Sequence, residues 1–594
     1  MRIKDALANI HKEHADDKLI PLYTVWGENL DKENVWQEYP RPQMQREHYQ
    51  MLHGEWDYAI VSLEDEKDFE SQGEILVPFS PETLLSGVGR QLQPTEYLWY
   101  QKELTFTTEE SERKVQGQRC LLHFDAVDQQ AIVYINGTEV ARHYGGYLPF
   151  EADITDYVGD EKIVLQVRVR DESDTSYHTR GKQTLKRGGM FYTAQSGIWQ
   201  SVWYEWVPKN HVKRYRIIPD YDNAKVIIEL FSRSKFESVS LDVDGDKDNN
   251  ITVHYDSEES NVTISFADRK FESWSPENPY LYYFTLKADE DVIRGYFAMR
   301  AFTIEKDEKG IPRFCLNHKP YFLNGLLDQG YWPDGLMTAP CDEAFVYDIE
   351  LAKQKGFNMI RKHIKIEPLR WYYHCDRLGM IVWQDMVNGG TTYNMPWVCY
   401  MPTAIPALGR VIKDNMYHMF SRKVVESREC WEIECRGTLD HLCNVPSIST
   451  WVPFNEAWGQ FDAARIANEV KAYDPTRTVD HASGWFDQKA GDFNSVHNYF
   501  RKLRVEKDDK RAFVISEYGG YACHIKGHSS VERIFGYKKY ETKEELSKAF
   551  HQLLDEQVMP LVEKGLSGVV YTQLSDVEEE VNGLVTYDRK VCKI

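Results

Sequence analysis

Two patterns of apolar and polar positions divide the chain. From about residue 50 to residue 304, apolar and polar residues alternate in short runs that are interrupted by Gly, Pro, Asp and Asn. This alternation is typical of strands in β-sandwiches, where one face of each strand is buried. From about residue 305 onward, short apolar runs alternate with segments whose apolar positions recur at helical spacing. The second pattern predicts βα units and a parallel sheet.

The second half contains eight apolar runs that are candidate strands. We expect them at residues 320–325, 358–363, 380–385, 447–454, 478–485, 495–499, 512–516 and 568–573. A helix is expected over residues 341–355, with Phe345, Ile349 and Ala352 on one face. Eight parallel strands are the number that a closed (β/α)8 barrel needs, so residues 305–594 are predicted to form one.

The first half is predicted to form two sandwiches. Residues 1–45 read as a polar lead-in with a short helix, followed by strands up to residue 207. Asn136-Gly137 indicates a hairpin, because both residues tolerate the positive φ values of a type I′ turn. Residues 208–304 suit an immunoglobulin-like sandwich, and the charged run at residues 244–249 suits a solvated loop tip.

Two glutamates stand where this barrel would place its chemistry. Glu456 follows Asn455 after one β-rich run, and Glu517 follows Ser516 after another. The ends of parallel strands meet at one edge of a barrel, so both carboxylates are expected there. A single glutamate at a strand end can equally cap a helix or form a surface salt bridge. A facing pair is the machinery of glycoside hydrolysis.

The segments around these glutamates resemble glycoside hydrolase family 2, which contains β-galactosidases, β-glucuronidases and β-mannosidases. Further resembling segments lie at residues 96–102, 124–141, 145–155, 196–203 and 274–282, so that the resemblance covers almost the whole chain. It implies a jelly-roll sugar-binding domain at residues 1–207, an immunoglobulin-like sandwich at 208–304 and a catalytic TIM barrel at 305–594. It also implies an acid/base role for Glu456, a nucleophile role for Glu517 and retention of configuration.

The resemblance implies roles for further residues. Arg361 would lie beside the nucleophile, Asn455 would hydrogen-bond the sugar 2-hydroxyl, and Tyr499 would orient the nucleophile. The structural alternatives are a rim salt bridge, a turn residue and a core aromatic, respectively. Several other residues near strand ends are candidates for hydroxyl contacts or ring stacking, with a structural role as the alternative: Asp328, His363, Asp385, Trp458, Trp485, His497, Trp332 and Trp383.

Three departures from the family pattern bear on the sugar. His363 follows Arg361 at a shifted spacing, and strand 8 carries Tyr571 where many members have Trp. Residues 579–589 lack the Asn-x-Lys motif of glucuronidases and are acidic, which disfavours an anionic sugar. We therefore expect an exo-acting enzyme for neutral sugars, first a β-galactosidase. The alternatives are a β-mannosidase, an arabinosidase or galactofuranosidase, a β-glucuronidase and a carbohydrate-binding protein without turnover.

Composition narrows the partners further. The net charge of −22 disfavours nucleic acid and anionic membranes, and no run reaches 18 apolar residues. The first 14 residues carry charges throughout, so no signal peptide is expected. The 10 cysteines show no paired metal-ligand spacing, which favours free cytosolic thiols. We expect a cytoplasmic protein with a carbohydrate substrate, no cofactor, no bound metal and, by analogy with the family, homo-oligomers.

Overall fold

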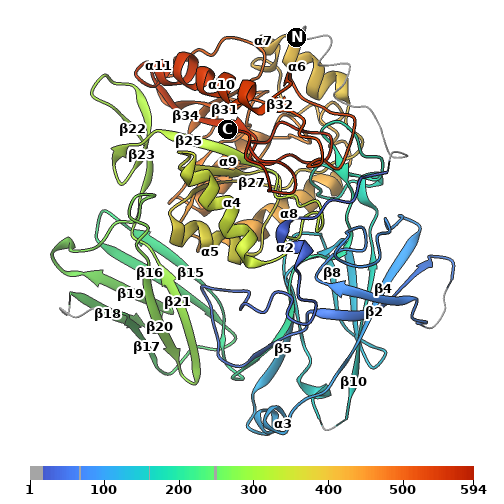
Figure 1. Ribbon diagram of the computed structural model, residues 1–594. Coiled ribbons are helices and arrows are strands. Elements are labelled where there is room, and N and C mark those ends of the chain that lie inside the picture. Colours follow the sequence, from blue (N-terminus) through green and yellow to red (C-terminus); the bar gives the residue numbers. More distant parts are fainter. Residues whose placement is uncertain (1–17, 66–68, 160, 246–249) are drawn as a thin grey trace.

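The computed structural model describes residues 18–65, 69–159, 161–245 and 250–594. Two β-sandwiches lie side by side beneath one α/β barrel (Figure 1). The described part of the lead-in, from residue 18, contains the short helix α2 (Val25–Glu28) and packs on the barrel through Thr24, which donates two hydrogen bonds to Asp334. Residues 1–17, and positions 246–249 of the expected loop tip, lie outside the described residues.

The first sandwich has the two sheets expected of a jelly roll. One has the order β1 (Tyr49–Met51), β14 (Val202–Val207), β5 (Arg119–Phe124) and β9 (Phe150–Asp153). The other has the order β3 (Gly73–Val77), β2 (Gly54–Ser62), β4 (Glu96–Leu104), β10 (Ile163–Arg170), β7 (Gln130–Ile135) and β8 (Thr138–Tyr144). Asn136 and Gly137 join β7 to β8 with φ values of 49° and 78°, which confirms the predicted hairpin turn.

The second sandwich is immunoglobulin-like, as expected. Its sheets are β15 (Val212–Asp220), β16 (Lys225–Ser232), β19 (Asn261–Phe266) and β18 (Ile251–Asp256), facing β17 (Val239–Val243), β20 (Tyr282–Ala288) and β21 (Asp291–Phe297). Arg46 of the lead-in joins the two sandwiches, since it lies 3.1 Å from Glu205 of the first and 2.8 Å from Asp291 of the second. Trp274 anchors the sandwich to the barrel by donating its indole N–H to the Asp376 carbonyl.

The barrel contains all eight expected strands. Their order is β29 (Thr478–Val479), β28 (Ile448–Val452), β27 (Ile381–Asp385), β26 (Met359–Lys362), β25 (Leu323–Asp328), β34 (Leu566–Thr572), β31 (Ala512–Gly519) and β30 (Phe493–Asn498), all parallel. β29 and β30 are not paired as neighbours in this sheet, so the barrel is nearly closed. β29 is much shorter than the expected 478–485 because the chain leaves the sheet after Val479.

Two expectations about the barrel differ from the structure. Pro320, placed at the start of the first strand by sequence, belongs to β24 (Lys319–Pro320) in an antiparallel sheet with β22 (Phe302–Lys306) and β23 (Pro312–Leu316). Phe314 of this sheet and Trp383 both pack against Phe493. Trp383 and Trp332 are only 1% and 2% exposed, so core packing, not sugar stacking, accounts for both.

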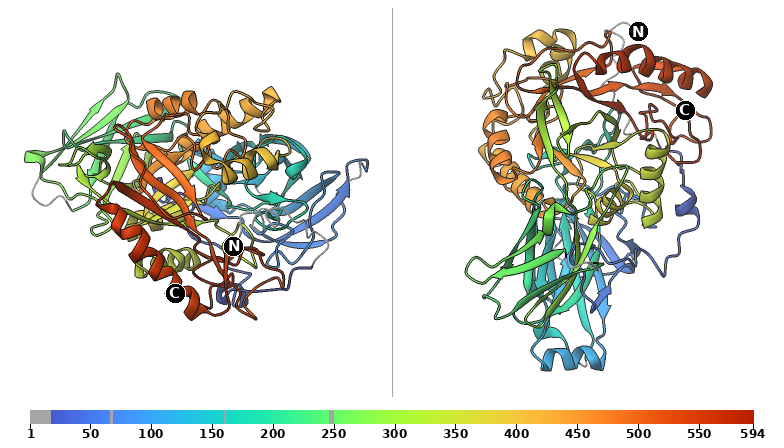
Figure 2. Two further views of the ribbon diagram at one scale, coloured as in Figure 1. Left: turned by 90° about the horizontal axis from the view of Figure 1, so that it is seen from above. Right: turned by 90° about the vertical axis from the view of Figure 1, so that its left-hand side faces the viewer.

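The outer helices cover only part of the barrel. They are α4 (Asp342–Gln354), α5 (Leu369–Leu378), α8 (Val425–Leu442), α9 (Ala463–Tyr473), α10 (Lys543–Leu553) and α11 (Met559–Val562), and Figure 2 shows them outside the strands. α4 buries Phe345, Ile349 and Ala352, as predicted. The connections 480–492 and 499–511, both fully described, contain no helix. No helix of the described chain is both long and apolar enough to cross a membrane.

Candidate active site

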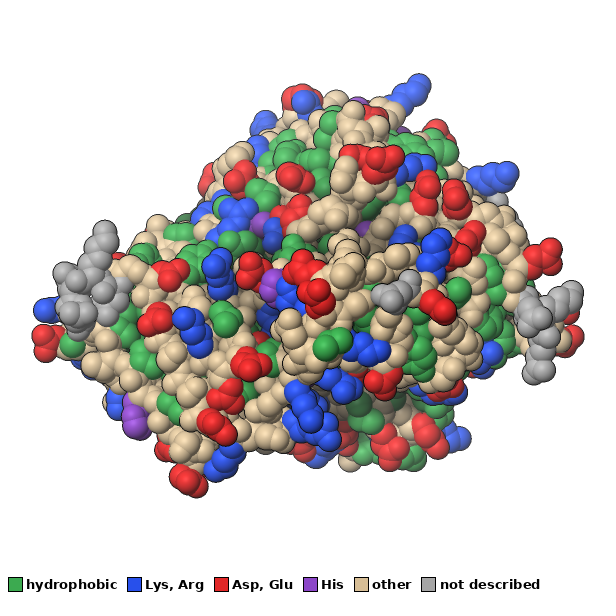
Figure 3. All heavy atoms as spheres, turned by 90° about the horizontal axis from the view of Figure 1, so that it is seen from below, with side chains coloured by type: hydrophobic (Ala, Val, Ile, Leu, Met, Phe, Trp, Pro, Cys, Tyr) green, Lys and Arg blue, Asp and Glu red, His purple; other side chains and the backbone are tan. Residues whose placement is uncertain are grey.

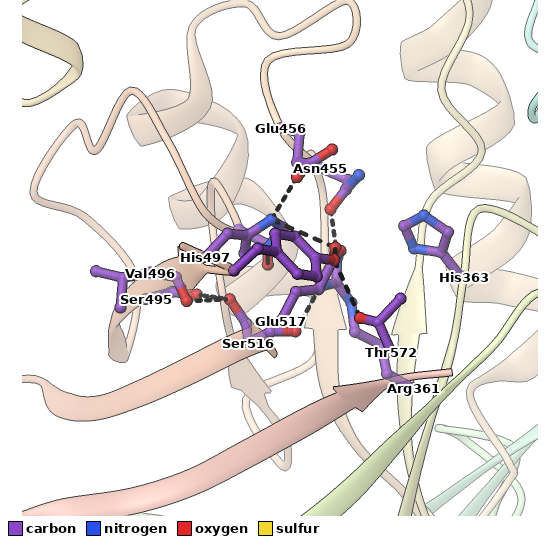
Figure 4. A network of polar contacts seen from close by, with 12 residues as sticks. Arg361, His363, Asn455, Glu456, Ser495, Val496, His497, Ser516, Glu517 and Thr572 are labelled. Carbon is purple, nitrogen blue, oxygen red and sulfur yellow. Dashed lines mark hydrogen bonds and ion pairs between the residues drawn. The ribbon is translucent and has the colours of Figure 1, made fainter. Parts of the chain in front are cut away.

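Glu456 and Glu517 meet at the C-terminal edge of the barrel. Glu517 lies within the last residues of β31, while Glu456 lies four residues beyond β28 in a left-handed conformation, with φ at 48°. Its N–H donates to the Ser483 carbonyl at 2.9 Å, which fixes this turn. One oxygen of each carboxylate and Nδ1 of His497 all lie within 4.8 Å of one another (Figure 4).

A fully buried arginine organises the floor of this site. Arg361, on β26, donates from Nη1 to Glu517 at 3.2 Å and from Nη2 to Asn455 Oδ1 at 2.8 Å. Asp385 accepts from its Nε and Nη2 at 2.9 and 3.0 Å. Because all of these partners are buried, the planar guanidinium fixes the orientation of both a carboxylate and an amide. Arg361 therefore lies where the sequence expectation put it, beside Glu517.

Tyr499 supplies the second donor to Glu517. Its hydroxyl hydrogen-bonds Oε2 of the carboxylate and lies 3.0 Å from the Thr572 hydroxyl. The ring of Tyr537 stacks on it, with centroids 4.1 Å apart. Tyr499 thus points into the site rather than into the core.

His497 lies between the two glutamates. Its Nδ1 is 2.7 Å from Oε1 of Glu456 and 3.5 Å from Oε2 of Glu517, and Nε2 is 3.1 Å from the Ser483 hydroxyl (Figure 4). Burial lowers the pKa of this histidine to about 4, so the imidazole is neutral near pH 7. A neutral ring can accept a hydrogen bond at Nδ1 from a protonated carboxyl group while its Nε2–H donates to the Ser483 hydroxyl.

The two carboxyl groups differ in their partners. Burial raises the pKa of Glu456 and of Glu517 above the ordinary value. The charge of Arg361 opposes this rise at both groups, but Glu517 also accepts hydrogen bonds from Arg361 Nη1 and from the Tyr499 hydroxyl. Among the described residues, Glu456 accepts from the Trp458 indole N–H at 3.2 Å and contacts His497. Glu517 thus has more donors that favour its ionised form than Glu456 has.

Two predicted contact residues lie behind the site. Asp328 accepts from Lys362 Nζ at 2.5 Å and from the Gly330 N–H at 2.8 Å. Lys362 lies 4.2 Å from the Trp371 ring of the outer helix α5, so the pair faces away from the barrel interior, opposite to Arg361. Asp385 is occupied by Arg361 and His363, the latter at 2.8 Å. Both aspartates thus support other side chains, and their carboxylates are already used within the protein.

The predicted tryptophans differ from each other. Trp458 is buried, with edge contacts to Phe191 and Tyr393, and its N–H serves Glu456. Trp485 is half-buried and lines the pocket above the glutamates, beside His497. Trp485 is therefore placed for ring stacking, and Trp458 is placed to support a carboxyl group.

The pocket also contains residues that the sequence did not indicate. Tyr537 follows β31 in an irregular segment, Cys399 and Pro402 come from the insertion after β27, and Met190 comes from the first sandwich. These residues share no motif or periodic pattern, since they lie in irregular segments and in short helical turns at residues 396–404, which are far apart in the sequence. Only the aromatic character of the Tyr537 segment could have drawn attention to it.

The loop that carries Met190 is held by the acidic run of the barrel. The Thr193 N–H donates to Glu578 at 3.1 Å, Arg187 donates to Glu579 at 2.6 Å, and the Tyr192 hydroxyl donates to Glu580. All three glutamates are buried, and none is among the residues that line the pocket around Glu456. The charge of Glu580 nevertheless reaches the pocket: burial first, and then the charges of Glu456 and Glu580, raise the pKa of Tyr537, which lines it.

One cation of this loop region acts on the site. Burial raises the pKa of both Glu456 and Glu517, and the charge of Lys182 is among those that oppose the rise. Its neighbour Arg180 donates to the Gly390 carbonyl of the barrel at 2.6 Å, which holds the segment over the strand ends. In the described residues, the contact of the Lys182 ammonium is the Tyr192 ring, 6.0 Å from its nitrogen.

The donor set Glu456, His497 and Glu517 is of a kind that binds metal ions. The spacing of these donor atoms indicates a direct hydrogen bond, because Nδ1 of His497 and Oε1 of Glu456 are 2.7 Å apart. Two ligands on one zinc ion, each at about 2.0–2.2 Å, would be more widely separated in tetrahedral geometry. The residues as placed do not fit a chelate.

The chain thus combines a nearly closed parallel barrel, two glutamates at the C-terminal edge of that barrel and two preceding β-sandwiches. The family models agree along the chain: a "sugar binding domain" matches residues 87–208, "Glycosyl hydrolases family 2" matches 210–300, and a "TIM barrel domain" matches 309–592. The protein belongs to glycosyl hydrolase family 2.

Relatives in this family differ in the sugar that they name. A β-galactosidase of Thermoanaerobacter pseudethanolicus is 22% identical over 82% of this chain and 63% of its own length. A putative β-glucuronidase of Formosa agariphila is 25% identical over 73% of this chain and 51% of its own. The chain thus spans between half and two thirds of these curated relatives.

Solved structures share the fold over nearly the whole chain. A β-glucuronidase of an uncultured Clostridium has a TM-score of 0.69 at 17% identity, covering 93% of this chain and 97% of its own. A β-galacturonidase of Eisenbergiella tayi has a TM-score of 0.66 at 18% identity, with 94% and 97% covered. At such identities the likeness establishes the architecture.

Proposed function

We propose that the protein is a retaining, exo-acting β-glycosidase that removes a terminal neutral sugar, with β-galactosides as the first candidates. The observation that carries this proposal is the approach of Glu456 and Glu517, whose nearest donor oxygens lie within 4.8 Å. Retaining enzymes hold their two carboxyl groups about 5–5.5 Å apart, whereas inverting enzymes need about 6.5–9.5 Å to admit a water molecule. The unequal partners of the two groups support distinct roles.

In the first step, the Glu517 carboxylate attacks the anomeric carbon while Glu456 gives its proton to the departing oxygen. The glycosidic C–O bond breaks and a glycosyl ester forms on Glu517. In the second step, the Glu456 carboxylate takes a proton from water, whose oxygen attacks the anomeric carbon and releases Glu517. Arg361 and Tyr499 stabilise the Glu517 carboxylate before attack and after release.

Asn455 is placed to bind the sugar at the reacting carbon. Its Oδ1 accepts from Arg361, which fixes the amide so that Nδ2 is the free end. Nδ2 is buried and has no hydrogen-bond partner among the described residues. A sugar hydroxyl would satisfy this donor, and the 2-hydroxyl is the group whose contact strengthens in the transition state.

A hexuronic acid is the second candidate for the terminal sugar. The observation that favours it is Lys182, a cation whose field reaches both glutamates and whose amine has no carboxylate partner in the described chain. The solved structures named as glucuronidases and a galacturonidase are consistent with it. The relatives named as β-galactosidases support the neutral sugar.

A panel of aryl glycosides separates the candidates. It contains the β-galactoside, β-mannoside, β-glucoside, β-glucuronide, β-galacturonide, α-L-arabinosides and β-galactofuranoside. Proton NMR of the first-formed product should show the β-anomer of the β-substrates. Glu517→Gln should abolish turnover. Turnover that survives this substitution, or an inverted first product, would refute the mechanism, and tight binding without turnover by the parent would favour a sugar-binding protein.

The Lys182→Met variant tests whether the terminal sugar is a uronide or a neutral sugar. For a uronide, kcat/KM should fall by about 10-fold or more, since a charged hydrogen bond is lost. For a neutral glycoside, Lys182→Met should leave KM nearly unchanged. A parent enzyme that prefers a uronide would replace the neutral-sugar candidate with the second one.

The proposal extends to the compartment, which is the cytoplasm, and to the assembly of the chain. All 10 cysteines are free, which supports a reducing cytoplasm. Homo-oligomers are proposed by analogy with the family, and light scattering on the purified chain tests them.

A further inference from the structure

A groove opens beside the catalytic pocket, where the barrel has no outer helices. It has a volume of about 1120 Å³ and runs along the segments that follow β29 and β30. Pro406, Trp485, His497, Asn498 and Arg501 line both the pocket and the groove. The two spaces are therefore continuous, with the half-buried ring of Trp485 at their junction.

The lining of this groove is predominantly basic, opposite in sign to the net charge of the protein. The chain has a net charge of −22, yet the groove has six cations against two carboxylates, Asp487 and Glu506. The cations are Arg410, Arg501, Lys502, Arg504, Lys507 and Lys564. By contrast, the face in Figure 3 shows acidic and basic side chains interspersed. A groove of one dominant sign concentrates ligands of the opposite sign.

Both carboxylates of the groove are already paired. Asp487 receives two hydrogen bonds from Arg511, at 2.8 and 2.9 Å, and Glu506 lies 2.6 Å from Arg410. Within the described residues, four exposed cations have no carboxylate within 4.0 Å: Arg501, Lys502, Lys507 and Lys564. These four cations are therefore free to interact with a ligand in the groove.

Arg501 is fixed in position relative to Glu456 and Glu517. β30 ends at Asn498, directly after His497, which contacts Glu456. Asn498 Oδ1 accepts from the Arg501 N–H at 3.0 Å, and Arg501 Nη2 donates to the Ala404 carbonyl at 3.1 Å. A single turn therefore joins the catalytic pocket to the charged wall of the groove.

We propose that this groove binds the leaving-group side of the substrate, and that this part is an anionic oligosaccharide carrying carboxylate or sulfate groups. The proposal rests on the proposed function, because the leaving side is defined by cleavage in the adjoining pocket. A terminal sugar would occupy the pocket, the next ring would stack on Trp485, and the anionic groups would lie along Arg501, Lys502, Lys507 and Lys564.

Binding to the inactive Glu517→Gln variant tests the proposal by calorimetry. The probes are tetragalacturonate, a sulfated chondroitin tetrasaccharide and uncharged cellotetraose. We expect at least one anionic probe to bind about 10-fold or more tightly than cellotetraose at about 0.01 M ionic strength. The difference should collapse at about 1 M, where the screening length falls from about 30 Å to about 3 Å. The two anionic probes distinguish carboxylate from sulfate.

Charge-neutralising variants locate the site. On the Glu517→Gln background, Lys502→Gln/Lys507→Gln/Lys564→Gln should weaken anionic binding by about 5-fold or more, consistent with three exposed ion pairs. The matched control, Lys209→Gln/Lys287→Gln/Lys423→Gln, removes three exposed lysines elsewhere and should bind as the parent does. Equal affinity for all probes, no salt dependence, or equal losses in both triple variants would overturn the proposal.

Aryl-glycoside turnover distinguishes this failure from failure of the proposed function. With Glu517 intact, the groove variant should retain the parent kcat/KM on the best aryl glycoside, whose small leaving group does not reach the groove. Anionic binding by a parent that hydrolyses no glycoside would remove the leaving-side assignment. Hydrolysis without preferential anionic binding would remove the groove proposal alone.

Discussion

The indole N–H of Trp458 donates a 3.2 Å hydrogen bond to Oε2 of Glu456. This bond stabilises the ionised carboxylate and so opposes the rise in the Glu456 pKa that burial causes. Trp458→Phe should keep the contacts with Phe191 and Tyr393 but lose the donor. Because the pKa of Glu456 then rises, the basic limb of the kcat/KM profile should move to higher pH by about one unit. A shift to lower pH would exclude Glu456 as the proton donor.

Tyr499→Phe tests the acidic limb. The Tyr499 hydroxyl donates to the Glu517 carboxylate, so its removal should raise the pKa of Glu517 and move the acidic limb to higher pH. We expect kcat to fall by about 100- to 1000-fold, as for other single donors at reacting charges. The matched control is Tyr537→Phe, which removes the hydroxyl of the ring that stacks on Tyr499 and, among the described residues, takes no hydrogen bond away from Glu517. A fall in kcat without any shift would assign Tyr499 a purely steric role.

Glu456→Gln should discriminate between leaving groups. An acid matters most when the departing oxygen is strongly basic, so alkyl glycosides should lose about 100- to 10000-fold in kcat/KM. Dinitrophenyl glycosides need little protonation and should lose far less in the first step. Equal losses on both substrates, measured under kcat/KM conditions, would contradict the acid role.

The Asp328→Asn variant tests whether the Asp328 carboxylate stabilises the fold or contacts the substrate. The variant leaves Lys362 beside Glu367 alone, and removal of one buried partner costs about 3–5 kcal/mol. Burial would raise the pKa of Asp328, but the Lys362 ammonium prevails and lowers it. Its stabilisation is therefore present above the unfolded pKa of about 3.9 and is lost as pH falls through the lower folded value. Urea unfolding should show the largest difference between parent and variant near neutral pH, with KM little changed in the folded variant.

Chelation should leave the activity unchanged. The 2.7 Å contact between His497 and Glu456 leaves no room for an ion bound by both, so neither step of the proposed mechanism uses one. Turnover after dialysis against EDTA, compared with turnover after adding back Mg²⁺ or Zn²⁺, checks this. A metal-dependent recovery would require a different arrangement of the pair.

The barrel was largely predictable because parallel strands buried on both faces read as continuous apolar runs. The pairing of Arg361 and Tyr499 with Glu517 followed from the resemblance, whose motifs mark strand ends. Asp328 shows the limit of that reasoning. It ends a strand beside the site, but its partner is Lys362, and successive residues of β26 point to opposite sides, so that Arg361 faces inward and Lys362 outward.

The remaining site residues depend on packing between domains. Lys182 and Met190 belong to a sandwich loop, and no periodicity or motif indicates that it would cover a barrel. Nor did the sequence indicate that Glu578, Glu579 and Glu580 would accept hydrogen bonds from this loop. Likewise, the absence of helices between residues 480–492 and 499–511 is visible in sequence only as polar loops, whereas the groove beside them is a three-dimensional property.

The hydrogen bonds between residues 187–193 and three buried glutamates also determine the smallest fragment of the chain that should be active. A barrel cut free of the first sandwich would retain Glu456 and Glu517 but would expose Glu578, Glu579 and Glu580 without the donors that now bind them. Truncation at residue 305 should therefore yield an insoluble or inactive fragment, whereas mild proteolysis should fail to release a working barrel. We therefore expect the proposed activity to require the first sandwich together with the barrel.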